Sequence, residues 1–151
     1  MRRLFFAQKA FIVKDGQLLL VRKSADDPDQ PGLWEVPGGR MELGEDLQDH
    51  IRREVREEVG LEVKPGAPFY VWQWQVRRYG DGGQPEEWHI VAVARLCEVV
   101  SGQLSSEGRV AGDHLAEIAW VPIDQIDRYE FIANMRPVIA SFLEALHRER
   151  R

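Results

Sequence analysis

Residues 39–61 read GRMELGEDLQDHIRREVREEVGL, and their periodicity decides the first element of the fold. Apolar residues recur at intervals of four, the spacing of one face of a helix: Leu47, Ile51, Val55 and Val59. Gly60 follows in the position of a C-terminal cap. The pattern predicts a helix over 46–59 with one face buried.

The same helix carries an unusual acidic face. Glu57 and Glu58 lie three and four residues after Glu54, so these carboxylates share about a third of the helix circumference. Like charges at this spacing repel, and a hard divalent cation would offset that cost. An all-oxygen donor set favours Mg²⁺, with Mn²⁺ possible, over zinc. The alternative is a solvated helix whose acids pair with its own arginines. The helix alone does not distinguish this alternative from a metal site, so the flanking sequence is needed.

The remaining pattern alternates short strands with turns. Asp15-Gly16 separates two apolar runs and is typical of a β-hairpin turn. Strands are expected over 10–13, 17–21, 33–36, 69–76, 88–100 and 118–121, with Pro37-Gly38-Gly39 ending the third. A closing helix would bury a face made of Val138, Ile139, Phe142, Leu143 and Leu146.

Composition limits the class of protein. The 151 residues, 44% hydrophobic, predict a single domain over 1–151 with its own core. A net charge of −5 argues against a protein that holds duplex nucleic acid. No apolar run approaches the roughly 20 residues of a membrane helix. The single Cys97 excludes an internal disulfide and indicates a reduced core residue, so a cytoplasmic location is expected.

Residues 39–61 resemble the Nudix box. The matching positions are Gly39, Glu45, Arg53, Glu54, Val55, Glu57, Glu58, Gly60 and Leu61. The Asp15-Gly16 turn, residues 32–39 and residues 118–122 are also similar to the MutT-type branch of this family. The resemblance therefore extends over most of the chain and favours the metal site over a solvated helix.

The resemblance implies a fold and a reaction. The fold would be α/β (α+β), an α/β/α sandwich with a mixed central sheet between helices. The activity would be divalent-metal-dependent hydrolysis of a nucleoside diphosphate linked to another group. We expect a nucleoside triphosphate pyrophosphohydrolase that releases pyrophosphate and a nucleoside monophosphate, acting on a small-molecule substrate as a monomer or homodimer. The alternatives are an ADP-ribose or sugar-nucleotide pyrophosphatase and a non-catalytic nucleotide sensor.

The resemblance also implies metal ligands and catalytic groups. Glu54, Glu57 and Glu58, with the Gly39 carbonyl, would hold the metal. Arg53 would position Glu57, four residues after it. Glu45 also matches the box, but the helix dipole alone would favour an acid at this helix start. Candidates for a further acid are Glu117, which we favour, Asp113 and Glu107.

The resemblance to the MutT-type branch also implies substrate contacts at two places. Arg22 or Lys23 would touch the nucleotide, or both are solvated charges at a strand end. Phe131 and Asn134 would contact the base, or Asn134 is a helix cap. Histidines on helices, His50 included, are expected on exposed faces.

Overall fold

The computed structural model describes residues 1–109 and 115–149, which build one mixed sheet with helices. Its strands are β1 (Arg2–Lys14), β2 (Gln17–Lys23), β3 (Trp34–Glu35), β4 (Gly38–Arg40), β5 (Leu61–Tyr79), β6 (Pro85–Gly102) and β7 (Leu115–Pro122). Its helices are α1 (Leu47–Val59), the 3-10 helix η1 (Ile123–Arg128) and α2 (Met135–Glu149). The sheet order is β3-β2-β1-β6-β5, with β4 paired to β1 and β7 to β2. Only the pairing of β1 with β6 is parallel within the described residues.

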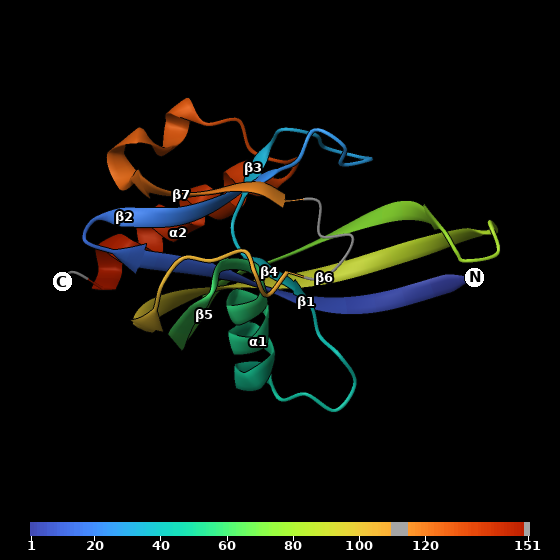
Figure 1. Ribbon diagram of the computed structural model, residues 1–151, viewed down its shortest axis with the longest axis horizontal. Helices are drawn as coiled ribbons and strands as arrows, with labels where there is room; N and C mark the ends of the chain where they lie inside the picture. The colour runs from blue at the N-terminus through green and yellow to red at the C-terminus, as the bar shows by residue number, and fades with distance from the viewer. Residues whose placement is uncertain (110–114, 150–151) are drawn as a thin grey trace.

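Helices α1 and α2 cover opposite faces of this sheet (Figure 1). Alternation along β2 divides its apolar side chains between the two layers. Leu18 and Leu20 pack in the core that contains α2, whereas Leu19 and Val21 pack in the core that contains α1. The predicted α/β/α sandwich with a mixed sheet is confirmed.

Helix α1 is bounded by the caps that its sequence indicates. The Asp46 side chain accepts a hydrogen bond from the Asp49 amide at 2.8 Å. Gly60 adopts a left-handed conformation with φ 79°, which favours glycine. The helix predicted over 46–59 is therefore confirmed, with Asp46 as its cap.

The predicted hairpin is also confirmed, and most strands are longer than expected, β1 above all, which covers Arg2–Lys14 where a strand was expected over 10–13. Asp15 and Gly16 both have positive φ, 51° and 74°, as a tight hairpin turn requires. β5 and β6 pair antiparallel over lengths that exceed 69–76 and 88–100 (Figure 1).

One local prediction is incomplete and another is wrong. The third strand, β3, ends at Glu35 before Pro37, as predicted, but Gly38 and Gly39 belong to a further strand, β4, which pairs with β1. A side chain at Gly38 would collide with the Gln8 carbonyl, so glycine allows this close approach. Leu143 is 42% exposed, and the buried face of α2 continues through Ala145 instead.

Cys97 lies in β6 and is buried, as predicted for a core residue. Burial raises the pKa of its thiol to about 12. Among residues 1–109 and 115–149, no helix is long and apolar enough to span a membrane.

Two glycines with nearly equal φ give a matched test of packing. An added Cβ at Gly60 would lie 2.7 Å from the Gln103 carbonyl oxygen, whereas one at Gly16 meets nothing within 4 Å. Gly16→Ala should cost about 1 kcal/mol of backbone strain. Gly60→Ala should cost about 1–3 kcal/mol more, because it adds a steric clash. Urea denaturation of both variants measures the difference, and equal losses would contradict this account.

Candidate active site

A cavity of about 770 Å³ opens on the α1 side of the sheet. Six of the predicted site residues line it: Lys23, Gly39, Arg53, Glu54, Glu57 and Glu58. Helix α1 contributes the carboxylates and Arg53, β2 contributes Lys23, and β4 contributes Gly39. The acidic face of α1 thus forms a wall of the cavity and is not simply a solvated surface.

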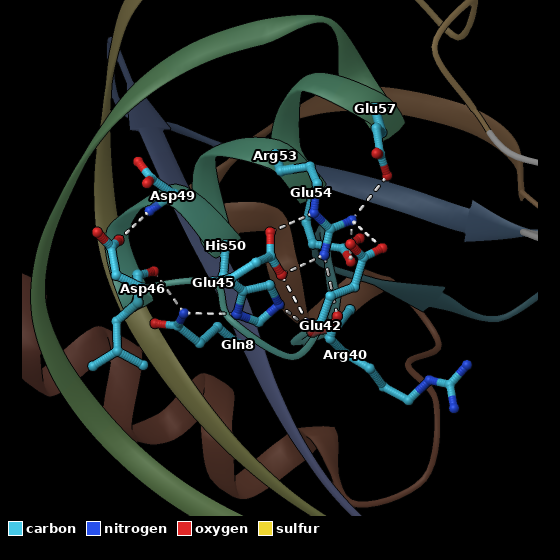
Figure 2. A network of polar contacts seen from close by, with 12 residues as sticks. Gln8, Arg40, Glu42, Glu45, Asp46, Asp49, His50, Arg53, Glu54 and Glu57 are labelled. Atoms are coloured by element: carbon cyan, nitrogen blue, oxygen red, sulfur yellow. Dashed lines mark hydrogen bonds and ion pairs between the residues drawn. The ribbon is translucent and has the colours of Figure 1, made fainter.

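Arg53 is the centre of the polar network in this wall (Figure 2). Its Nε donates to Glu45 at 2.6 Å, and its Nη1 lies 3.2 Å from both Glu54 and Glu57. Its Nη2 reaches the Arg40 carbonyl of β4 at 3.3 Å. Through its hydrogen bonds with Arg53, Glu45 has its pKa lowered to about 2. In this arrangement Glu45 anchors Arg53, and Arg53 links the acidic wall to β4.

Glu54 and Glu58 are held close to the protein interior. An added Cβ at Gly39 would lie 2.6 Å from Glu54 Oε2, so glycine leaves the space that this carboxylate occupies. Glu58 is only 8% exposed, although it is charged.

The donor chemistry fits a hard divalent cation. Three carboxylates from one helix face the same cavity, and Mg²⁺ prefers oxygen ligands. In the part of the chain that the structure describes, no three His, Cys, Asp or Glu side chains are gathered closely enough to enclose an ion. Carboxylates that now contact Arg53 would therefore turn to bind a cation.

The prediction that His50 lies on an exposed helix face is wrong. His50 is fully buried, and its Nε2 lies 3.0 Å from the Gly39 carbonyl oxygen. Burial lowers the pKa of His50. The carbonyl that we predicted as a metal ligand thus already has a hydrogen-bonding partner on α1, and its metal role stays a prediction.

Sequence reasoning missed several charged residues of the cavity wall, and Lys9 and Glu35 are the pair that contacts the predicted Lys23. Glu35 is 4% exposed and binds Lys9 Nζ at 2.6 Å and Lys23 Nζ at 2.9 Å. Burial alone would raise the pKa of Glu35, but the two ammonium groups outweigh it and lower this pKa to about 2. A signal was present, since Glu35 lies within the strand expected over 33–36 and Lys9 directly precedes the strand expected over 10–13.

The lining of the cavity also includes aromatic and cationic side chains. Phe5, Trp74, Arg40 and Arg78 line it. The Arg40 guanidinium lies 4.4 Å from the centroid of the Phe5 ring. Trp72 and Trp74 share one face of β5 with ring centroids 6.2 Å apart, as alternation predicted, and only Trp74 of this pair lines the cavity.

The structure does not bring Arg22 and Glu117 to the cavity. Because β2 alternates, Lys23 faces the α1 layer and Arg22 faces the α2 layer. Arg22 Nη1 lies 3.5 Å from Glu117, and its guanidinium lies 5.8 Å from the centroid of Trp34. Glu117 therefore stands apart from the α1 carboxylates.

Phe131 and Asn134 likewise lie outside the residues that line this cavity. Phe131 forms an isolated bridge with Trp34 and packs against the α2-side core. Asn134 is exposed and has φ 67°, unlike the extended backbone of a usual helix cap. Of the other two candidate acids, Glu107 lies beside Glu117 at a separate pocket, and Asp113 lies outside the described residues.

Glu35 gives a test of the buried charges. Glu35→Gln should lower the free energy of unfolding by about 3 kcal/mol at pH 7, because two lysines lose their buried partner. The folded pKa lies below the ordinary value of 4.5, so this stabilisation is present above pH 5 and is lost as pH falls toward 2. Urea denaturation at pH 7 and pH 3 should show the difference from wild type shrinking at pH 3.

The matched control for this measurement is Glu62→Gln, which removes the half-exposed partner of Arg56. This change should cost less than about 1 kcal/mol at pH 7, because a surface ion pair contributes little. Equal losses in both variants would contradict a special role for Glu35.

Comparisons with known proteins find relatives of similar sequence. The chain is 29% identical over 133 residues to the nucleoside triphosphatase NudI of Salmonella agona (strain SL483), covering 85% of this chain and 89% of the relative. It is 38% identical over 81 residues to a CTP pyrophosphohydrolase of Escherichia coli (strain K12), covering 54% of this chain and 58% of the relative.

Solved structures with similar folds are also known. A NUDIX hydrolase from Nitrosomonas europaea superposes with a TM-score of 0.70 at 21% identity, covering 99% of this chain and 92% of that one. A MutT protein from Methanosarcina mazei Go1 superposes with a TM-score of 0.66 at 27% identity, and the match covers 99% of this chain and 97% of that one. The profile of the NUDIX domain matches residues 7–145. With the acidic face of α1 set in a cavity, this match shows that the chain belongs to the Nudix hydrolase family.

Proposed function

We propose that the protein is a Mg²⁺-dependent nucleoside triphosphate pyrophosphohydrolase that releases pyrophosphate and a nucleoside monophosphate. The observation that supports the proposal is that one cavity is lined by three kinds of side chain: the carboxylates of α1, a lysine pair, and aromatic rings that include Trp74. A nucleotide has the matching parts, since its phosphates need cations and its base has an apolar face that stacks on aromatic rings. The names of NudI and of the CTP pyrophosphohydrolase support the same substrate class.

The reaction is a displacement at phosphorus. The oxygen of water forms a bond to phosphorus, and the P–O bond between the α and β phosphates breaks. Nudix hydrolases generally need a divalent metal. When bound, it offsets the charge on the phosphoryl oxygens and makes water a better nucleophile near neutral pH. Glu54, Glu57 and Glu58 would hold it, and Mg²⁺ fits because the donors are carboxylate oxygens.

The lysine pair would bind phosphate oxygens. Each ammonium group has three N–H donors, and Glu35 accepts one from Lys9 and one from Lys23. The other donors can meet phosphate. Burial opposes the charge of Lys23, but the carboxylates of Glu35 and Asp27 raise its pKa, so it remains protonated at neutral pH.

A substrate panel separates this function from its alternatives. The purified protein with Mg²⁺ is given nucleoside triphosphates, ADP-ribose and sugar nucleotides, and phosphate is detected with malachite green. A triphosphate pyrophosphohydrolase yields a signal only when inorganic pyrophosphatase is added. An ADP-ribose or sugar-nucleotide pyrophosphatase yields a signal only with alkaline phosphatase. Nucleotide binding without either signal would indicate a non-catalytic sensor.

The carboxylates give the direct test of mechanism. Glu57→Gln and Glu58→Gln preserve side-chain shape but remove the charge that would hold the cation. We expect kcat to fall by about 100-fold or more in each variant, with the circular dichroism spectrum unchanged. Glu144→Gln, on the exposed side of α2, is the control and should keep wild-type kcat. If both α1 variants kept wild-type kcat, the chemistry would lie elsewhere.

A further inference from the structure

Two buried polar side chains lie behind the acidic wall. Gln8 of β1 is 1% exposed and His50 of α1 is 0% exposed, and neither lines the cavity. Burying polar groups costs free energy unless they are hydrogen-bonded. Apolar side chains could fill this space, so the pair calls for a physical explanation.

The contacts of Gln8 fix the tautomer of His50. The Gln8 amide nitrogen donates to the Leu47 carbonyl at 2.8 Å, and its amide oxygen accepts from Arg95 Nη1 at 3.3 Å. These partners set which end of the amide is nitrogen. The same nitrogen lies 2.8 Å from His50 Nδ1, which must therefore accept. A neutral imidazole then carries its proton on Nε2.

The proton on Nε2 points to the backbone of β4. His50 Nε2 lies 3.0 Å from the Gly39 carbonyl oxygen, so α1 donates a hydrogen bond to β4 at this point (Figure 2). His50 and Glu54 are one helical turn apart on the same face of α1. The bond therefore sets the distance between β4 and the turn of helix that bears Glu54.

Gly39 is also the residue against which the Glu54 carboxylate rests. An added Cβ at Gly39 would lie 2.6, 2.7 and 2.8 Å from the three carboxyl atoms of Glu54. With so little space, a shift of β4 toward or away from α1 would move or release that carboxylate. The orientation of the Glu54 carboxylate thus depends directly on the position of Gly39.

We propose that His50 is a positioning residue for the hydrolysis: its Nε2–H holds Gly39 against α1, which keeps Glu54 oriented for the divalent cation, and Gln8 holds His50 in the required tautomer. This inference rests on the proposed function, because it assigns Glu54 to cation binding. His50 touches neither cation nor substrate and acts through Gly39.

Mn²⁺ binding without nucleotide tests the proposal, with electron paramagnetic resonance measuring free Mn²⁺. His50→Ala should weaken Mn²⁺ affinity by about 10-fold or more, the usual effect of losing a residue that supports a ligand. Gln8→Leu should weaken it while leaving His50 in place. His50→Gln should retain more affinity than His50→Ala, because an amide can still donate to the Gly39 carbonyl.

Val63→Ala is the control, since Val63 is a buried residue of the α1-side core away from this network. It should lower the melting temperature and leave Mn²⁺ affinity unchanged. Wild-type affinity in folded His50→Gln and Gln8→Leu would overturn the positioning role, even if His50→Ala did not fold. A wild-type protein that bound no Mn²⁺ would contradict the proposed function, and the positioning role with it.

Discussion

The arrangement of the site depends on the charge of one guanidinium group. Arg53 meets the carboxylates of Glu45, Glu54 and Glu57 and, more distantly, Glu42. Hydrogen bonds with Glu45 raise the pKa of Arg53 above its ordinary value. Without this charge, acids crowded on one helical turn and the loop before it would repel one another. A cation that binds in the cavity would therefore replace Arg53 as the partner of carboxylates whose positions Arg53 already restricts.

Two hydrogen bonds from side chains of α1 to backbone carbonyls of β4 fix the position of this network. Arg53 reaches the Arg40 carbonyl, and His50 reaches the preceding carbonyl of Gly39. The tightly packed backbone of β4 is thus bound to the helix from two consecutive turns. Carboxylates on an isolated helix would keep several rotamers. These two hydrogen bonds restrict the position of the helix face that bears the carboxylates relative to the sheet.

The predictable parts of the fold are those set by neighbouring residues. Helix 46–59 and the Asp15-Gly16 hairpin depend on periodicity, caps and turn chemistry, all of which are local. The spacing of the carboxylates along the helix identified the acidic face, and the family resemblance added the mixed sheet and favoured a metal site on that face. The strand that contains Gly38 and Gly39 could not be predicted from neighbouring residues, because it exists only through pairing with β1, about thirty residues earlier.

Site residues that depend on tertiary contacts were harder to predict. The burial of His50 requires Gln8, and that of Glu35 requires Lys9, both from a strand distant in sequence. Arg22 and Lys23 are adjacent, yet strand alternation sends them to opposite layers. Both side chains are long cations, so their chemistry alone does not predict which of them lines the cavity.

The lone cysteine has a practical consequence. Cys97 sits in β6 beside Ile12 of β1, is 4% exposed, and has a thiol whose pKa is raised to about 12. Alkylating reagents attack the thiolate, which this environment suppresses. Native protein should resist such reagents until the central sheet separates. The chain therefore carries its own reporter of sheet opening, and the labelling rate would follow local unfolding with no engineered probe.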